Sequence, residues 1–516
     1  MQKQGVVAAG HESTAKAAGQ ILELGGNAFD AVIAAHLAAC VVEPVLSSLA
    51  GGGFLLAQTS KGNSALYDFF VQTPISKRPV EESDFFPISA DFGTVQQEFH
   101  IGLGSIATPG TVKGLFTVHR ELCSLPMPVL AEPAIDLARS GVCMNAFQAH
   151  IFEIVQAIYL QYPDALAIYG SKKNHGALIQ QGENFYQRDL ADCLETLAKE
   201  GEAFFYQGFI AETISQLCRE QGGHLDSQDF RQFNVIKRDP LSITYKDATV
   251  LTNPAPSSGG TLIAFALQLL NSIDTTQFNP GSCEYLELLA QIQGLTNKAR
   301  IDAHLSSGSH HPKEQILDPV NVEIYRNQIR SAPMCSRGTT HISIIDRKGN
   351  IASLTTSNGE GCGIFVPGTG IMLNNMLGEE DLNPTGFHQW PTNQRMTSMM
   401  APSIVTFPDH SLLALGSGGS NRLRTAILQV LINIIDFKMP LERAIHFPRI
   451  HQENGLLNIE AGFDSTEIAE LVKMNPQHKI WDGSNLFFGG AHSVTYSAEG
   501  FFGVGDPRRG GYAVNI

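Results

Sequence analysis

The residues with the clearest catalytic potential are two adjacent threonines, Thr339 and Thr340, which follow Gly338 and precede His341. A threonine hydroxyl is a weak nucleophile, but the α-amino group of the same residue can serve as its base. In model peptides this amino group has a pKa of about 8, which suits proton transfer at neutral pH. It becomes available only when the bond between Gly338 and Thr339 is broken. The sequence therefore predicts that the chain cleaves itself at this bond and then uses Thr339 as a nucleophile.

A second candidate element is the glycine-rich segment 416–420, which includes Gly418 and Gly419 and lies between a predicted apolar strand and a helix expected to begin near Asn421. Backbone amides at the positive end of a helix can stabilise an oxyanion. Glycine-rich segments are more often simple turns, and a phosphate-binding loop is a competing interpretation. The Lys-Ser/Thr pair that should follow in a phosphate loop is absent. Together with Thr339, the segment favours an oxyanion site.

Other catalytic patterns are missing from the sequence, which contains no GxSxG, HExxH or Walker motif and no GxGxxG after a strand. His304, His310 and His311 lie in or near the polar segment 306–313, but no pair has the spacing of helical metal ligands and no cysteine is close. A solvent-exposed loop is the favoured interpretation of that segment. The eight cysteines form no CxxC pair, which favours buried thiols over a zinc site or a disulfide framework. We therefore expect neither a metal nor a cofactor.

The charge of the chain limits its partners. It has 50 acidic and 35 basic residues and a net charge of -15, which disfavours nucleic acid and anionic membranes and favours small molecules. The first residues lack the apolar core of a secretory signal, so a cytoplasmic location is expected. The most apolar predicted helix, 28–42, is too short and too polar to span a bilayer and is expected to be buried.

Both strands and helices are predicted to position the candidate residues. Alternation from His341 to Asp346, a turn at 347–350 and a returning strand from Ile351 predict a hairpin that starts at Thr339. The remaining predicted strands are 5–9, 54–58, 65–70, 403–407 and 411–415. The clearest predicted helices are 14–24, 28–42, 111–122, 133–140, 146–160, 190–199 and 423–437. The region from 110 to 235 is mainly helical and is expected to pack outside the sheets.

Motifs along nearly the whole chain resemble those of the γ-glutamyltranspeptidases. They are Gly-Gly-Asn-Ala-Phe-Asp-Ala at 25–31, Ala-Gly-Gly-Gly-Phe at 50–54, Thr-Pro-Gly-Thr-Val at 108–112, Pro-Ser-Ser-Gly-Gly at 256–260, Gly-Thr-Thr-His-Ile-Ser-Ile-Ile-Asp at 338–346, Gly-Ile-Met-Leu-Asn-Asn at 370–375, Arg-Met-Thr-Ser-Met at 395–399 and Asp-Pro-Arg-Arg at 506–509. The resemblance implies an α+β fold, a four-layer αββα sandwich of the N-terminal-nucleophile hydrolase type. It also implies a precursor that yields a large subunit, 1–338, and a small subunit, 339–516. The implied activity is transfer or hydrolysis of γ-glutamyl groups from glutathione-like donors through a covalent γ-glutamyl-threonine.

The resemblance also implies roles for single residues. Thr339 is similar to the family's nucleophile, and Gly418 and Gly419 are similar to its oxyanion-hole glycines. Ser357 stands where the family has a hydroxyl residue that contacts the nucleophile. The residues similar to those that hold the glutamyl amino and carboxylate groups are Asn358, Glu379 and Ser398. A carboxylate can pair with an ammonium, and a hydroxyl can donate to a carboxylate. Without the resemblance, the acidic run 379–381 would be interpreted as a solvated loop.

Several residues depart from the family pattern. Phe70 stands where an arginine for the substrate α-carboxylate is expected, Met376 replaces a glutamine, and Met399 replaces the second serine of a pair. The loop 357–363, which holds Cys362, is about two residues short. Phe70 is either a pocket residue or a core aromatic on a strand, and Arg395 is one candidate for the missing positive charge.

Three functions therefore remain open. The first is a γ-glutamyltransferase or glutathione hydrolase. The second is a related acylase on glutaryl, cephalosporin-like or other acyl amides, which Phe70 and Met376 favour. The third is an uncleaved, inactive binding or structural protein, which is disfavoured because four residues are retained together: Thr339, His341, Gly418 and Gly419. The donor, the acceptor and the assembly of the processed unit into a homo-oligomer are left open by the sequence.

Overall fold

The computed structural model describes residues 3–91, 96–305, 315–326, 339–383 and 385–516. Two antiparallel sheets lie face to face at its centre. The first sheet has the strand order β22 (Tyr512–Asn515), β1 (Gly5–Ala9), β11 (Thr340–Asp346), β12 (Ile351–Ser357), β2 (Gly52–Gln58), β3 (Ser64–Phe69) and β8 (Ile236–Arg238). The second sheet has the order β21 (Gly500–Val504), β20 (Gly490–Ser497), β16 (Leu412–Gly418), β15 (Ser403–Thr406), β10 (Ala248–Thr252) and β9 (Leu241–Tyr245).

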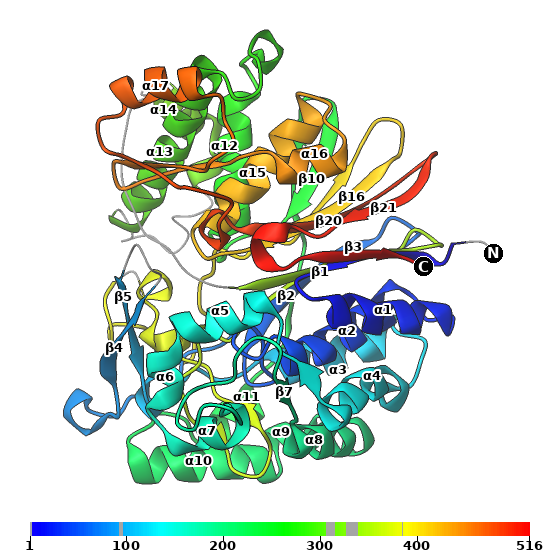
Figure 1. Ribbon diagram of the computed structural model, residues 1–516, viewed down its shortest axis with the longest axis vertical. Helices are drawn as coiled ribbons and strands as arrows, with labels where there is room; N and C mark the ends of the chain where they lie inside the picture. Colours follow the sequence, from blue (N-terminus) through cyan, green and yellow to red (C-terminus); the bar gives the residue numbers. More distant parts are fainter. Residues whose placement is uncertain (1–2, 92–95, 306–314, 327–338, 384) are drawn as a thin grey trace.

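Helices cover the outer face of each sheet (Figure 1). Those on the side of the first sheet include α1 (Glu12–Glu23), α2 (Ala28–Val42), α3 (Thr111–Leu122), α4 (Met127–Ser140) and α8 (Arg188–Glu200). Those on the side of the second sheet include α12 (Gly259–Leu270), α13 (Cys283–Leu305) and α15 (Arg422–Ile435). This arrangement confirms the predicted α+β fold with four layers in the order αββα.

The other elements surround these layers. The remaining helices are α5 (Ala146–Ile154), α6 (Gln156–Leu160), α7 (Pro163–Tyr169), α9 (Ala203–Tyr206), α10 (Phe209–Gln221), α11 (Ser227–Gln232), α14 (Pro319–Arg326), α16 (Leu441–His446) and α17 (Ser465–Met474). The remaining strands, in small sheets, are β4 (Phe86–Asp91), β5 (Gln96–Ile101), β6 (Val142–Cys143), β7 (Asn184–Phe185), β13 (Phe365–Val366), β14 (Ile371–Met372), β17 (Ile450–Glu453), β18 (Leu456–Ile459) and β19 (His478–Ile480).

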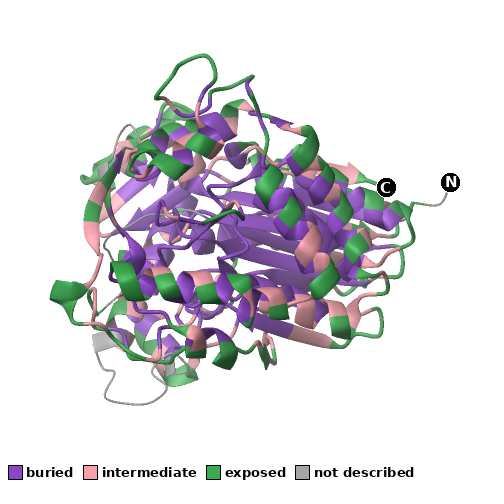
Figure 2. Ribbon diagram, turned by 90° about the horizontal axis from the view of Figure 1, so that it is seen from below, coloured by how far each residue is buried: buried purple, intermediate pink, exposed green. Residues whose placement is uncertain are grey.

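The side chains of β11 point alternately to the two faces of the first sheet, and this explains how the layers meet. Ile342 and Ile344 pack in the hydrophobic core that includes α1 and α2, whereas Ile345 packs in the core shared with the second sheet. Successive side chains of a strand point to opposite faces, so β11 contributes to both layers and is buried throughout. Figure 2 shows the same pattern for the whole molecule, with buried residues in the sheets and exposed residues on the outer sides of the helices.

Helix α2 is buried along its whole length, as the apolar run 28–42 predicted. Its N-terminus is closed by a capping box, in which Asn27 accepts from the amide of Asp30 and the Asp30 side chain accepts from the amide of Asn27. Asp346, at the far end of β11, accepts a hydrogen bond from the amide of Ala28 at 3.0 Å. These contacts fix the position of α2 relative to β11.

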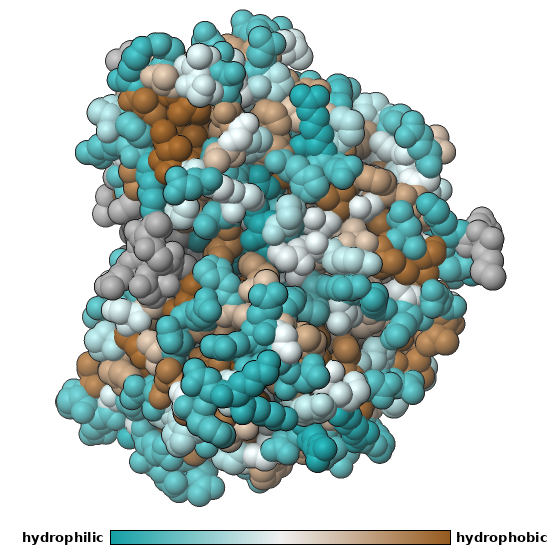
Figure 3. All heavy atoms as spheres, viewed as in Figure 1, coloured by the Kyte–Doolittle hydropathy of each residue, from teal (hydrophilic) through white to brown (hydrophobic). Residues whose placement is uncertain are grey.

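Several boundaries differ from the prediction. The helix expected at 146–160 is divided at Val155 into α5 and α6. The long helices α12 and α13 lack a clear polar face, since α12 is almost wholly buried, and the periodicity of the sequence did not mark them. Segment 306–313 with His310 and His311 lies outside the described residues, as does Gly338. On the face seen in Figure 3 the surface is largely hydrophilic, in keeping with the net charge of -15.

Candidate active site

Thr339 lies directly before β11 and lines a pocket between the layers. The pocket holds about 390 Å³ of space, which includes the solvent at its open side. Four residues predicted from the sequence line it together: Thr339, Ser357, Glu379 and Ser398. Phe70 also contributes to its wall.

The β11–β12 hairpin places the first two of these residues. Thr340 pairs with Thr356, and the same register extended by one residue places Ser357 opposite Thr339. Ser357 accepts a hydrogen bond from the amide of Gly359 at 3.0 Å, which holds its side chain in the turn after β12. The predicted contact between Ser357 and the nucleophile is therefore consistent with the hairpin register.

The two threonines of the pair point to different layers. Thr340 donates a hydrogen bond from Oγ1 to Glu43 at 2.9 Å, and Thr14 donates to the other oxygen of the same carboxylate at 2.8 Å. Burial raises the pKa of Glu43 to about 7, although both threonine hydroxyls oppose that shift. Glu43 thus fixes the start of β11 from the helix side, a role that sequence reasoning missed.

His341 is held between the two sheets. Its ring nitrogens lie 2.8 Å from Thr355 Oγ1 and 2.8 Å from Ser343 Oγ. Burial lowers the pKa of His341 well below its usual value, so the ring is neutral. A Cβ added at Gly416 would lie 2.3 Å from the ring, which explains why this position of β16 is glycine. His341 therefore spaces the sheets, and both of its nitrogens are engaged away from Thr339.

The glycine pair packs against the nucleophile from the second sheet. A Cβ added at Gly418 would lie 1.9 Å from the backbone oxygen of Thr339. Gly419 has a φ of 120°, which L side chains rarely adopt. Ser420 then donates to Asp381 at 2.7 Å, just before α15 begins. The predicted strand, glycine turn and helix are all present, with the turn beside Thr339.

Arg509, in the 3-10 helix η8 (Pro507–Arg509), holds the backbone of the nucleophile. It donates to the carbonyl oxygen of Thr339 at 3.3 Å and to that of Leu486 at 3.2 Å. Burial lowers the pKa of Arg509 to about 10, and Glu360 opposes the shift. Nothing in the sequence indicated this contact, except that Arg509 belongs to the Asp-Pro-Arg-Arg motif.

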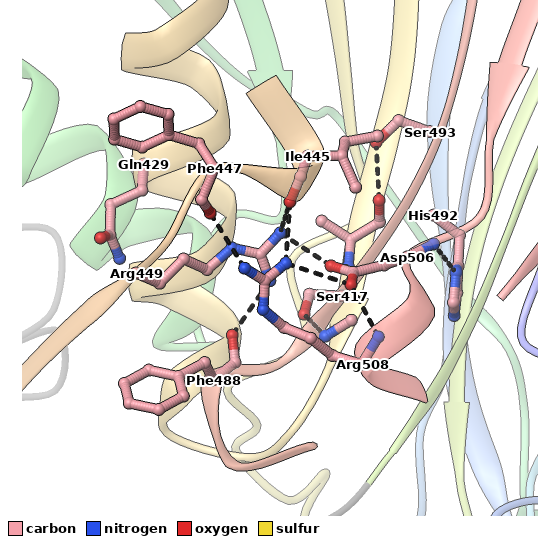
Figure 4. A network of polar contacts seen from close by, with 12 residues as sticks. Ser417, Gln429, Ile445, Phe447, Arg449, Phe488, His492, Ser493, Asp506 and Arg508 are labelled. Atoms are coloured by element: carbon pink, nitrogen blue, oxygen red, sulfur yellow. Dashed lines mark hydrogen bonds and ion pairs between the residues drawn. The ribbon is translucent and has the colours of Figure 1, made fainter. Parts of the chain in front are cut away.

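A buried network of ion pairs holds η8 in place (Figure 4). Asp506 accepts from Arg449 at 2.7 Å, from Arg508 at 3.3 Å and from the amide of Ala491 at 2.8 Å. Burial opposes ionisation of Asp506, but the two arginines outweigh it and hold the pKa of this carboxyl well below its usual range. Arg508 also pairs with Glu460 at 2.7 Å. The network fixes the segment that carries Arg509.

The other predicted substrate residues differ in their surroundings. Ser398 accepts from the amide of Met400 at 3.1 Å, which leaves its hydroxyl hydrogen for another acceptor. The side chain of Asn358 is fully buried and has no hydrogen-bond partner among the described residues. Gly359 contributes to the pocket wall and Asn358 does not. The structure thus brings Ser398 to Thr339 but keeps the Asn358 side chain out of the pocket wall.

Phe70 is both a core residue and a pocket residue. It is fully buried, stacks on Phe54 with ring centroids 5.5 Å apart and lines the pocket. Arg395, considered as a substitute for the missing arginine, donates to the carbonyl oxygens of Phe70 and Asn234. Its Nε lies 3.5 Å from Asp68. Its guanidinium is therefore directed to the protein backbone and to Asp68 and not to the pocket.

No arrangement of three His, Cys, Asp or Glu side chains that could hold a metal ion occurs within the described residues. None of the helices in the described part of the chain has the length and apolar character needed to cross a bilayer. The cytoplasmic location stays a prediction.

Comparisons with known proteins agree with this geometry. The sequence profile of the family described as Gamma-glutamyltranspeptidase matches residues 14–516. The chain is 31% identical to the glutathione hydrolase proenzyme of Pseudomonas aeruginosa over 87% of this chain and 83% of that protein. It is 28% identical to the glutathione hydrolase proenzyme of Escherichia coli over 98% of this chain and 90% of that protein. Its fold is similar to that of cephalosporin acylase from Bacillus halodurans, with a TM-score of 0.85, 22% identity and coverage of 99% and 96% of the two chains. The chain therefore belongs to the γ-glutamyltranspeptidase family of enzymes.

Proposed function

We propose that the chain cleaves itself between Gly338 and Thr339 and then hydrolyses or transfers γ-glutamyl groups from glutathione-like donors. The observation that carries this proposal is the position of Thr339 in a pocket with Ser357, Glu379 and Ser398. Relatives named glutathione hydrolase proenzymes match nearly the whole chain, which supports both the precursor and the donor.

The proposed cleavage is an intramolecular reaction. The Oγ1 atom of Thr339 attacks the carbonyl carbon of Gly338, and the bond between the two residues breaks to give an ester and a new amino group. Water then hydrolyses the ester, which leaves a large subunit, 1–338, and a small subunit, 339–516, as two separate chains. Gly338 lies outside the described residues, so this step rests on Thr339 and on the relatives.

In the processed enzyme the α-amino group of Thr339 is the proposed base. His341 is neutral and both of its ring nitrogens are engaged, so it does not compete for this role. The amino group takes the proton from Oγ1, which attacks the γ-carbonyl of the donor. Amides of Gly418 and Gly419 stabilise the oxyanion, and the leaving amine takes the proton. Water or an amine then attacks the acyl-threonine and regenerates the hydroxyl.

Glu379 is the proposed partner of the donor's ammonium group, and Ser398 donates its hydroxyl hydrogen to the donor. Ser357, opposite Thr339, is proposed to orient the nucleophile. Asn358 stays a prediction as a substrate contact, since Gly359 takes its place in the pocket wall.

The two subunits are proposed to stay together after cleavage because they share both sheets. In the first sheet, β1 of the large subunit lies between β22 and β11 of the small subunit. In the second sheet, β10 of the large subunit pairs with β15 of the small subunit. Separation would expose these strand edges.

Intact-mass spectrometry of the purified protein tests the proposal. We expect a fragment that begins at Thr339 without added protease, turnover of a γ-glutamyl anilide, and a full-length, inactive Thr339→Ala variant. A wild-type protein that stays a single chain and still turns over the anilide would show that this mechanism is wrong.

Hydrolysis of other acyl amides is a second candidate, and the pocket wall favours it in one respect. Phe70, Met376 and Met399 give the pocket an apolar side where a carboxylate-binding group is expected. This apolar side favours acyl groups that carry no carboxylate at that position.

A further inference from the structure

The charged residues of the pocket wall are both acidic, among the described residues that line it. Asp381 accepts from Ser420 Oγ at 2.7 Å and from the Asn421 side chain at 3.2 Å, so its carboxylate fixes the turn before α15. Glu379 is the other acid, and its carboxylate lies beside the loop after β12. A Cβ added at Gly359 would lie 3.0 Å from its Oε1 atom. The pocket therefore offers a carboxylate to an incoming acyl group.

Lysine and arginine side chains are absent from the described part of the pocket wall. Phe70, Met376, Met399 and Met400 line the pocket, and all four side chains are less than 10% exposed. A carboxylate placed against them would lose its water without gaining a counter-charge, which is costly. Ser398 supplies a neutral hydroxyl, which can bind a carbonyl oxygen as readily as a carboxylate.

Two arginines that contact the backbone of pocket residues are engaged elsewhere. Arg395 is bonded to the carbonyl oxygens of Phe70 and Asn234 and lies beside Asp68. Arg509 is bonded to the carbonyl oxygens of Thr339 and Leu486. Neither is part of the described pocket wall. Turning either guanidinium into the pocket would break these buried contacts.

We propose that the acyl pocket recognises an ammonium group on the acyl chain through Glu379 and does not recognise an α-carboxylate. The enzyme then accepts the class of acyl amides that carry an amine on the acyl chain, whether or not they also carry a carboxylate. A γ-glutamyl group belongs to this class, but so does a 4-aminobutyryl group of the same chain length. This inference rests on the proposed function, since it concerns the acyl group transferred to Thr339.

Four anilides distinguish the effect of the ammonium group from the effect of the α-carboxylate. The γ-glutamyl anilide has both the ammonium and the carboxylate, the 4-aminobutyryl anilide has only the ammonium, the glutaryl anilide has only the carboxylate, and the butyryl anilide has neither. The rate without enzyme is subtracted, because the amine of the 4-aminobutyryl anilide can attack its own carbonyl. The measured quantity is kcat/KM for each anilide with the processed enzyme.

We expect the ammonium to raise kcat/KM by about 10- to 100-fold, the range set by one charge-assisted hydrogen bond. The 4-aminobutyryl anilide should match or exceed the γ-glutamyl anilide, and the glutaryl anilide should fall below the butyryl anilide. In Glu379→Gln the ratio of 4-aminobutyryl to butyryl turnover should fall toward one. Glu499→Gln, an exposed change in the turn between β20 and β21, is the matched control and should keep the ratio.

Introducing a cation tests the carboxylate side. Phe70→Arg should raise kcat/KM for the γ-glutamyl anilide relative to the 4-aminobutyryl anilide, if thermal unfolding shows that the variant folds. The wild-type panel decides the question in either case, because it needs no variant.

A wild-type enzyme that prefers γ-glutamyl over 4-aminobutyryl by tenfold or more, and glutaryl over butyryl, would overturn this inference and leave the proposed function intact. A protein without the Thr339 fragment, or a processed protein that turns over none of the four anilides, would overturn the proposed function as well.

Discussion

One added methyl group at Gly418 tests the position of the nucleophile. Gly418 ends β16, and a Cβ there would lie 1.9 Å from the carbonyl oxygen of Thr339. Real Cβ contacts are essentially never shorter than 3.0 Å, so the two segments must separate by 3.0 − 1.9 = 1.1 Å. Arg509 bonds the same carbonyl oxygen at 3.3 Å and restricts the direction of that shift. Gly418 is not among the glycines with positive φ, so alanine suits its backbone and the effect comes from this contact.

A displacement of about 1 Å at a reacting group can lower a rate by roughly 10²-fold. We expect Gly418→Ala to reduce kcat for a γ-glutamyl anilide by about that factor and to slow self-cleavage. Overpacking of this kind costs about 1–3 kcal/mol, so the variant should fold. Circular dichroism checks the fold, and initial rates together with intact mass check the chemistry. Gly483→Ala, where no atom lies within 4 Å of the added Cβ, is the control. A folded Gly418→Ala enzyme with wild-type kcat would refute the proposed geometry.

Three other changes probe the surroundings of the site. The pKa of Glu43 is raised from 4.5 to about 7, so its contribution to stability is present at low pH and is lost as the pH rises toward 7. Glu43→Gln should therefore raise the Tm relative to wild type more at pH 8 than at pH 5, and an equal difference at both would contradict this. Arg509→Met should lower kcat about tenfold or more because Thr339 loses a backbone contact, whereas Arg509→Lys should retain more activity; equal rates in both variants would argue against a role for the charge. Asp506→Asn should lower the free energy of unfolding by about 3–5 kcal/mol, because its buried arginine partners lose a carboxylate, whereas the exposed change Asp482→Asn should have little effect.

The parts of the fold that could be predicted from the sequence are those with a local signal. The β11–β12 hairpin followed from strict alternation, and the buried helix α2 followed from its apolar run. The pairing of strands could not be predicted in this way. Strand β1 pairs with both β11 and β22, which lie hundreds of residues further along the chain. Local periodicity indicates the type of an element but not its neighbour.

The same division applies to the site. The position of Ser357 opposite Thr339 follows from the hairpin register alone. Glu379 and Ser398 lie in irregular segments without periodicity, and only the resemblance to a family indicated them. Glu43 carried one local signal, because a charged residue that directly follows a buried helix needs a polar partner. The partner, Thr340, is 297 positions away and could not be identified from the sequence.

The contacts around Thr339 also explain how cleavage could create an active site without rearranging it. Thr340 is bonded to Glu43, the carbonyl oxygen of Thr339 is bonded to Arg509, and the hairpin register sets Ser357 opposite. The contacting atoms of Thr339, Thr340 and Ser357 all lie on the C-terminal side of the proposed cut, and Glu43, which belongs to the large subunit, contacts Thr340 and not the bond that breaks. Breaking the bond before Thr339 therefore leaves them in place, and the new amino group appears on a residue whose backbone is already fixed. The proposed processing would thus change the chemistry of Thr339 while the surrounding sheets keep its position.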